Sequence, residues 1–182
     1  MARRYDPERR ERIIDAAVRV VRAKGIAGLS HRSVAAEADV PLGSTTYHFA
    51  SLDELLVAAL RRWNETFAAT VRESARLSDP AVPLADELAR LLGEWLAGGR
   101  GPMELERELC LAALRRPALR PVAAEWADGL AALIVPRSDP ATARALVALM
   151  DGISLQALLT GGDFDAEYAR EMLARVVAGA AH

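Results

Sequence analysis

The sequence predicts an all-α fold of about nine helices. Apolar residues recur at three- and four-residue spacing, and clusters of Gly and Pro separate these periodic segments. No segment shows the two-residue alternation of β-branched residues that is typical of a strand. The chain has 182 residues, of which 52% are hydrophobic, so it can bury a sizeable core and is not globally disordered.

The first helix is expected to begin at Asp6-Pro7, where a capping side chain precedes a proline at the first helical position. Apolar residues then follow at helical spacing as far as Lys24. Gly25 is expected to end this helix, because glycine adopts the left-handed conformation that closes many helices.

Two short helices are expected next. Ser30 can cap the first, over about 31–38, and Asp39-Val40-Pro41 interrupts the chain before the second, over about 42–48. Two short helices joined by a turn and preceded by a longer helix are typical of a helix-turn-helix DNA-binding domain.

A long helix is expected from Leu52 to about Arg76, because Ser51 and Glu54 have the spacing of a capping box. The segment 77–83 contains two prolines and is expected to be a connection. Punctuation by Gly and Pro then separates five more expected helices, over about 84–98, 103–116, 118–134, 141–159 and 165–179.

Charge is distributed unevenly along the chain. Residues 1–62 hold 11 Lys+Arg and 8 Asp+Glu, whereas residues 63–182 hold 12 and 17, which together give the net charge of −2. The basic N-terminal part suggests a surface for a polyanion, and a solvated basic helix face is the alternative.

Several classes of protein are disfavoured by what the sequence lacks. The single cysteine, Cys110, excludes an intramolecular disulfide, and no metal-ligand spacing surrounds His48. The N-terminus has no apolar signal segment, and no run approaches the ~18 uninterrupted apolar residues of a membrane span. We therefore expect a cytoplasmic protein without metal, cofactor or membrane partner.

The second short helix carries side chains that suit DNA. Gly43-Ser44-Thr45-Thr46 offers small groups that permit close approach to a groove, and Tyr47 and His48 can donate to phosphate. Together with residues 13–17, Gly25, Val34-Ala35 and 51–55, this run resembles the TetR family of bacterial transcriptional repressors. The resemblance covers about residues 9–60 without an insertion.

The resemblance implies a DNA-binding domain over 1–50 and a helical ligand-binding and dimerisation domain over 51–182. It implies that Tyr47 and His48 contact phosphates, that Arg32 reaches a base, and that Ser30 and His31 lie near the DNA backbone. It also implies that five residues line the major groove: Pro41, Leu42, Gly43, Ser44 and Thr46. Val34, Val40 and Phe49 would be core residues.

The chain departs from the family pattern at several positions. Asp39 stands where the turn usually has Gly, so we expect it at positive φ, and Thr45 replaces a common core Leu. Leu42 and Ala50 stand where cations are common, which predicts a weaker phosphate contribution to DNA binding. Four arginines near the N-terminus are candidates for an arm that supplies part of the missing positive charge near the DNA, or they belong to a solvated, disordered start of the chain: Arg3, Arg4, Arg9 and Arg10.

The helix over about 141–159 is apolar nearly all round, with few interruptions such as Arg144 and Asp151. Such a helix needs cover on two sides. The resemblance implies that it forms a four-helix bundle with the helix over about 165–179 and their copies in a partner chain. Burial within one monomer is the alternative.

The ligand pocket is expected among the larger side chains of the middle helices. Glu106 falls inside an apolar arc, where it would meet a cationic ligand group or pair with an arginine of the same domain. Cys110 beside it is a candidate redox thiol or inert packing. The candidate ligand-binding residues are Trp63, Phe67, Trp95, Met103, Glu106, Cys110, Trp126 and Met150.

The sequence therefore favours a homodimeric repressor that a small apolar or amphipathic effector releases from a palindromic DNA operator. An interaction or scaffolding protein that acts mainly through its C-terminal helices is the alternative. An enzyme is not expected, because no paired Glu-x-x-His motif is present and nothing forms a pocket around Ser44 and His48.

Overall fold

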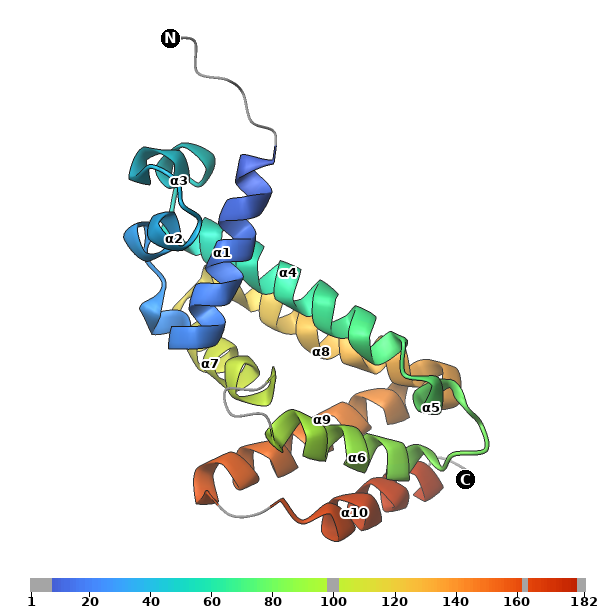
Figure 1. Ribbon diagram of the computed structural model, residues 1–182. Coiled ribbons are helices and arrows are strands. Elements are labelled where there is room, and N and C mark those ends of the chain that lie inside the picture. Colours follow the sequence, from blue (N-terminus) through green and yellow to red (C-terminus); the bar gives the residue numbers. More distant parts are fainter. Residues whose placement is uncertain (1–7, 98–101, 162–163, 180–182) are drawn as a thin grey trace. The chain divides into compact units, whose positions relative to one another are not determined.

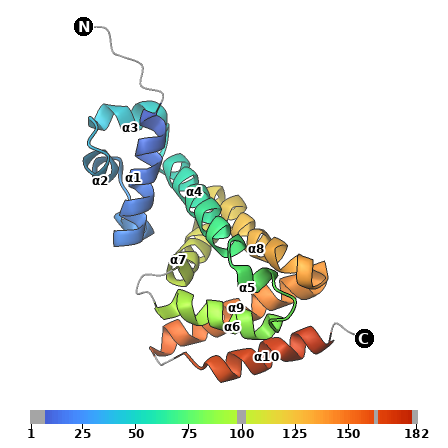
Figure 2. The same ribbon diagram turned by 45° about the vertical axis from the view of Figure 1, so that its right-hand side comes forward.

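The computed structural model describes residues 8–97, 102–161 and 164–179. These residues form ten α-helices and three short 3-10 segments and contain no strand, so the predicted all-α class is confirmed (Figures 1 and 2). The chain folds into two compact units, one of residues 1–63 and 108–122 and the other of residues 64–107 and 123–182. These are units of packing, and the functional division at residue 50 stays a prediction.

The first unit contains α1 (Arg9–Lys24), α2 (His31–Glu37), α3 (Leu42–His48), the start of α4 (Leu52–Arg72) and the end of α7 (Pro102–Arg115). Helix α1 packs against both α2 and α3, which also contact each other. The apolar spacing of the sequence produces this packing, because one face of each helix turns inward. The fully buried core residues include Ile13, Ala16, Ala17, Val34, Phe49, Leu55 and Leu56.

Local capping sets the limits of these short helices. The Ser30 hydroxyl accepts from the Ser33 backbone N–H at 3.0 Å, and the Ser33 hydroxyl accepts from the Ser30 N–H at 2.9 Å. Gly25 has φ 71°, and its N–H donates to the Val21 carbonyl at 2.8 Å. Asp39 has φ 51°, which confirms the left-handed conformation expected there. The expected start at Asp6-Pro7 lies outside the described residues, and α1 begins at Arg9.

Helix α4 begins as expected but ends early. The Ser51 hydroxyl accepts from the Glu54 N–H at 3.1 Å, and the Glu54 carboxylate accepts from the Ala50 N–H at 2.8 Å. The helix stops at Arg72, whereas the sequence predicted a single helix to Arg76. The separate short helix α5 (Ala75–Ser78) follows, so the described chain has ten α-helices where about nine were expected.

The second unit contains α5, α6 (Leu84–Ala97), most of α8 (Arg120–Ile134), α9 (Pro140–Thr160) and α10 (Ala166–Gly179). Helix α10 packs against α6 and α9, and these two also contact each other (Figures 1 and 2). By length and composition alone, α9 could cross a membrane, but core helices of soluble proteins pass the same test. Part of α9 is indeed core, because Leu146, Val147 and Met150 are buried.

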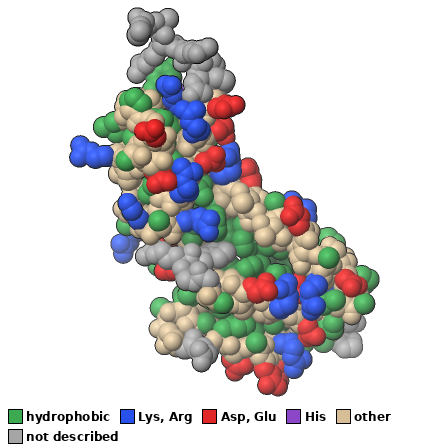
Figure 3. All heavy atoms as spheres, viewed as in Figure 1, with side chains coloured by type: hydrophobic (Ala, Val, Ile, Leu, Met, Phe, Trp, Pro, Cys, Tyr) green, Lys and Arg blue, Asp and Glu red, His purple; other side chains and the backbone are tan. Residues whose placement is uncertain are grey.

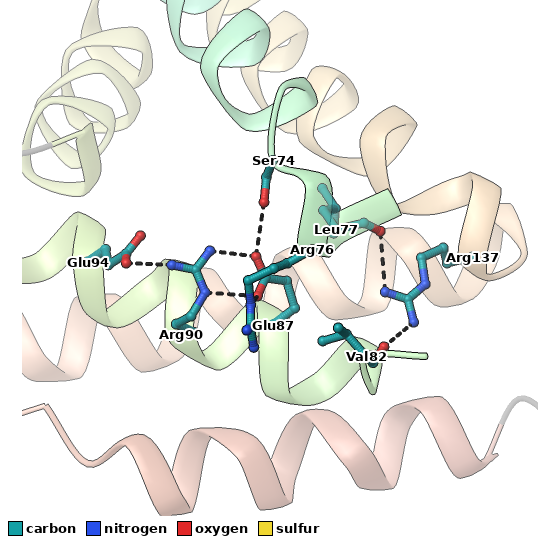
Figure 4. A network of polar contacts seen from close by, with 8 residues as sticks. All are labelled: Ser74, Arg76, Leu77, Val82, Glu87, Arg90, Glu94 and Arg137. Carbon is teal, nitrogen blue, oxygen red and sulfur yellow. Dashed lines mark hydrogen bonds and ion pairs between the residues drawn. The ribbon is translucent and has the colours of Figure 1, made fainter. Parts of the chain in front are cut away.

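A buried carboxylate anchors the segment around α5 to α6. Glu87 is fully buried and accepts from Arg90 at 2.5 and 2.8 Å, from Arg76 at 2.8 Å and from Ser74 at 3.1 Å (Figure 4). The hydrogen bonds from Arg90 lower the pKa of Glu87 to about 2, although burial opposes them. The paired charges offset much of the cost of burying this carboxylate.

The connection after α5 is fixed by one side chain. Arg137 donates to the backbone carbonyl of Leu77 at 3.3 Å and also to that of Val82 (Figure 4). The two carbonyls lie near the ends of the expected connection 77–83, and Leu77 itself is buried. This segment is therefore an ordered part of the second unit.

Candidate DNA interface and candidate ligand pocket

Helix α3 has an exposed face and a buried face. The exposed side chains include Tyr47, which is 79% exposed, and Leu42. Thr45 is fully buried, and its hydroxyl donates to the Leu42 carbonyl at 2.8 Å. Ser44 is only 4% exposed, which differs from the expectation that it lines the groove, because the helical twist turns it inward with Thr45. The exposed residues of the helix and its N-cap are Pro41, Leu42, Gly43, Thr46 and Tyr47.

Two polar rings lie at the C-terminal end of α3. The Tyr47 and His48 ring centroids are 5.1 Å apart with planes at 84°, an edge-to-face arrangement. His48 is half-buried, whereas Tyr47 extends into solvent. The phenol hydroxyl is therefore available to an outside acceptor such as a phosphate oxygen.

The start of α2 offers one free cation. Arg32 is exposed and forms no ion pair with any described residue. Ser30 is exposed, but its hydroxyl already serves the α2 cap. His31 is half-buried, and its Nδ1 has no hydrogen-bond partner among the described residues. Val40 is half-buried, so it is less enclosed than the predicted core position implied.

Much of the basic charge of the first unit is neutralised within it. Arg19 pairs with Glu37 at 2.6 Å, and Arg62 pairs with Asp15 at 2.5 Å and also with Glu11. Acidic and basic side chains are accordingly interspersed over the face shown in Figure 3. The local field at α3 therefore depends on a few uncompensated groups.

The expected N-terminal arm is only partly described. Arg3 and Arg4 lie outside the described residues. Arg9 and Arg10 belong to the first turn of α1, and the Arg10 guanidinium lies 5.1 Å from the centroid of the Phe49 ring. Arg10 is therefore a packed residue as well as a surface cation.

The second unit contains a small, largely apolar pocket. Its residues come from α4, α5, α6, α8 and α9, and the free space between them is about 10 Å³, roughly room for one water. The only charged residue in the lining is Asp151. The lining consists of Val71, Leu77, Leu88, Leu91, Trp95, Leu130, Leu133, Ile134, Val147, Met150 and Asp151.

Three aromatic rings of the second unit contact one another in series. The Phe67 ring stacks on Trp126, with centroids 4.7 Å apart, and meets Trp95 edge-on at 4.9 Å. Of the three rings, only Trp95 lines the pocket. The buried Trp126 Nε1 has no hydrogen-bond partner among the described residues.

Asp151 is held by an arginine of α7. Arg107 donates to the Asp151 carboxylate at 2.7 Å, and the two side chains are 18% and 29% exposed. Burial raises the pKa of Asp151, and Arg107 only partly opposes this effect. Arg107 also pairs with the buried Glu106 at 2.5 Å. Of the two alternatives for Glu106, the pair with an arginine is present, and the ligand contact stays a prediction.

The remaining predicted ligand residues lie outside the pocket lining. Trp63 belongs to the first unit, where the Arg22 guanidinium lies 5.0 Å from its ring centroid. Met103 is buried on α7, and Cys110 is half-buried on the part of α7 in the first unit. Periodicity locates large side chains on a helix but does not select the helix face that meets a cavity.

Of the eight predicted ligand residues, Trp95 and Met150 line the pocket, Phe67 contacts Trp95, and Trp126 contacts Phe67. Asp151 was not predicted as a ligand residue. Its signal was available, because it is the one carboxylate within the apolar helix α9.

A second hollow on the same unit is an open groove of about 400 Å³. Gly93 forms part of its wall, where an added Cβ would meet the Phe164 ring at 3.0 Å. The other lining residues are Leu96, Ala97, Ala157, Leu158 and Gly161.

Comparison with known proteins agrees with this architecture. Residues 13–59 match the profile of bacterial regulatory proteins of the tetR family, and residues 79–179 match the tetracyclin repressor-like C-terminal domain. The chain belongs to the TetR family. The resemblance of residues 9–60 is thereby confirmed, and the family membership extends to the C-terminal helices.

Two curated relatives in the TetR family are regulators named for transcription control. The transcriptional regulator BetI of Burkholderia thailandensis is 30% identical over 90% of this chain and 89% of its own length. The nicotine-responsive transcriptional repressor HdnoR of Paenarthrobacter nicotinovorans is 27% identical over 82% of this chain and 83% of its own length.

The multidrug binding protein EbrR is a similar TetR-family structure. Its complexes with proflavin and with ethidium each share 69% identity and a TM-score of 0.85 with this chain. The match covers 93% of this chain and 100% and 99% of those chains. Its complex with malachite green shares 70% identity and a TM-score of 0.76, covering 94% of this chain and 99% of that one. The chain is therefore a DNA-binding transcriptional regulator, in a family of regulators and not of enzymes.

Proposed function

We propose that the chain is a cytoplasmic, homodimeric repressor that a lipophilic aromatic cation releases from a palindromic operator. The observation that carries the proposal is the exposed face of α3 together with the apolar pocket around Trp95 and Asp151. The first feature suits a DNA groove, and the second suits a small apolar ligand with one positive charge.

The proposed contacts to DNA follow the family resemblance and are restricted to side chains that are at least partly exposed. Tyr47 and His48 contact phosphates, Arg32 reaches a base edge, and Ser30 lies near the backbone. Ser44 contributes to packing in this proposal, because it is buried. The major groove is lined by Pro41, Leu42, Gly43 and Thr46.

The homodimer is supported by an uncovered apolar face on the last two helices. Leu155, Leu158 and Leu159 of α9 are exposed, as is Tyr168 of α10. A second copy of these helices would cover that face in a four-helix bundle with two-fold symmetry. Two α3 helices would then enter successive major grooves about one helical turn apart.

The ligand class is supported by the pocket and by relatives. EbrR is named as bound to proflavin, ethidium and malachite green, which are all aromatic cations, and HdnoR is named as responsive to nicotine, an amine. The pocket holds about 10 Å³ in this structure, whereas ligand sites typically measure about 300–1,000 Å³. A ligand must therefore separate the helices that line the pocket. Helix α4 can transmit this movement to α3, because Val71 in its last turns lines the pocket and its first residues follow α3 in the chain.

The proposal is tested by a mobility-shift assay with DNA from upstream of the chain's own gene. We expect tight binding to that DNA, weaker binding to random DNA of equal length, and release on adding malachite green. Proflavin and ethidium intercalate into DNA, so they are kept for titrations without DNA. Equal affinity for the two DNAs, or no release, would contradict the proposal.

The dimer is tested by placing a charge on the α9 face. Leu159→Glu should yield monomers by analytical ultracentrifugation, because a carboxylate would be buried at the interface. Leu114→Glu is the matched control, since Leu114 on α7 is 73% exposed and Leu159 is 76% exposed. If both variants stay dimeric, the proposed interface is wrong.

A further inference from the structure

One ion pair involves Asp151, the single charged residue in the lining of the pocket. Asp151 lines the pocket from α9, and Arg107 donates to its carboxylate from α7 at 2.7 Å. We infer that Asp151 recognises the charge of the ligand, and that a lipophilic cation takes the place of Arg107 on this carboxylate. The inference rests on the proposed ligand-responsive function and assigns the residue that selects cations over neutral molecules.

Asp151 needs a positive partner because of its surroundings. The other ten residues of the lining are apolar or aromatic, among them Leu91, Trp95 and Val147. A carboxylate in such a place is stabilised only by a nearby cation or by donors, and these lining side chains supply no cation. Arg107 compensates it incompletely, since burial still raises the pKa of Asp151.

Arg107 can leave Asp151 without becoming an isolated charge. Glu106, the preceding residue on α7, lies 2.5 Å from the same guanidinium nitrogen. The guanidinium is also incompletely satisfied, because the buried Arg107 Nε has no hydrogen-bond partner among the described residues. After the exchange, Arg107 keeps its pair with Glu106, and the ligand cation pairs with Asp151.

An aromatic cation can compete with Arg107 for two physical reasons. Its ring buries apolar area against Leu88, Leu130 and Ile134, which the guanidinium of Arg107 does not. Its charge can also lie over the face of Trp95, which attracts cations. A neutral ring gains the first contribution but neither the second nor the ion pair.

The exchange removes an ion pair between α7 and α9. The Arg107–Asp151 pair is an ion pair that joins α7 to α9. The next residue on α7, Glu108, belongs to the unit that contains α3, and its carboxylate accepts from the Ile26 backbone N–H at 2.7 Å. The exchange therefore releases α7 from α9 at the residue where α7 enters the DNA-binding unit.

The inference is tested by titrating the intact 182-residue chain with two matched probes at pH 8. Proflavin is a cation at this pH, and acridine has the same three rings but is largely neutral. Quenching of tryptophan fluorescence reports binding, since Trp95 lines the pocket. The wild-type chain should bind proflavin more tightly than acridine. Asp151→Asn should weaken proflavin binding by about 10- to 100-fold and should not weaken acridine binding.

A variant of Arg107, the other residue of the pair, should change proflavin affinity in the opposite direction. Arg107→Gln removes the competing cation and should strengthen proflavin binding by about tenfold. A pair with a purely structural role would weaken binding in both variants. Asp151→Glu should retain the preference for proflavin, and Glu94→Gln should change nothing, because Glu94 is an exposed carboxylate paired with Arg90 outside the pocket.

The outcomes separate the inference from the proposed function. If the wild-type chain binds neither probe, the proposed ligand class fails. If it binds both but Asp151→Asn leaves proflavin affinity unchanged, the pocket stands and the charge assignment is wrong. If circular dichroism shows that Asp151→Asn is unfolded, the titration of Arg107→Gln tests the inference. Weakened or unchanged proflavin binding by Arg107→Gln would then overturn the proposed exchange.

Discussion

The two units of this protein differ in where their candidate binding residues lie. In the first unit these residues lie on the surface, and in the second they line an internal pocket. The first encloses a core around Ile13, Phe49 and Leu55 and presents α3 to solvent, with Tyr47 largely exposed. The second turns Trp95 and Asp151 inward, toward a pocket that is nearly closed. A DNA-reading surface must hold its shape, whereas an effector site must be able to open. The difference predicts that core mutations have different consequences in the two units.

The largest expected effect compares one core deletion from each unit. Phe49→Ala should lower the free energy of unfolding by about 3–5 kcal/mol and weaken DNA binding, because it leaves a cavity where the fully buried Phe49 ring packs. Leu88→Ala should cost about 2–3 kcal/mol but should strengthen proflavin binding, because it enlarges the pocket. Urea unfolding and dye titration measure both. Weaker proflavin binding by Leu88→Ala would contradict an adaptable pocket.

The next prediction concerns pH and the buried carboxylate of the second unit. The pKa of Glu87 is about 2 in the folded chain and 4.5 in the reference state, so its ionised form is the stabilising one. Its contribution is complete above pH 4.5 and disappears as the pH falls toward 2. We expect it to be about 2 kcal/mol, less than the full shift implies, because Arg76 and Arg90 are partly exposed.

Urea unfolding of wild type and Glu87→Gln at pH 7, 4 and 3 measures this contribution. The difference between the two chains should be largest at pH 7 and should shrink at pH 3. Glu94→Gln is the control, since Glu94 is exposed. Parallel pH profiles for wild type and Glu87→Gln would show that Glu87 does not contribute in this way.

A smaller effect is expected at the DNA surface. Tyr47→Phe should weaken operator binding by about fivefold, the loss of one phosphate hydrogen bond of about 1 kcal/mol, and should leave the melting temperature unchanged. Random DNA should lose affinity by a similar factor, because a phosphate contact carries no sequence information. A loss confined to the operator would instead assign Tyr47 to a base.

The smallest expected effect is a gain in stability. Asp39→Gly should raise the free energy of unfolding by about 0.5–1 kcal/mol, because glycine tolerates φ 51° better than a residue with a side chain. Ala38→Gly is the control and should be destabilising, since Ala38 has the right-handed conformation. Thermal unfolding of the wild type, Asp39→Gly and Ala38→Gly measures both changes in stability. A destabilised Asp39→Gly would mean that the Asp39 side chain stabilises the turn.

Features that depend on neighbours in the chain could be predicted from the amino acids alone. These include the limits of α3, the caps at Ser30 and Ser51, the positive φ of Asp39 and the buried positions of Val34 and Phe49. Caps, turns and helical periodicity act over about four residues, so the local pattern contains the information. The family resemblance rests on the same short segment.

The packing of helices distant in the chain decided the rest. It placed Trp95 at the pocket and Trp63 in the other unit, turned Ser44 inward, and made Asp151 the charged residue of the pocket. Each of these outcomes depends on which helix faces meet, and side-chain shape and volume across the core settle that choice. No pattern along a single helix contains that information, because the partner faces lie many residues away.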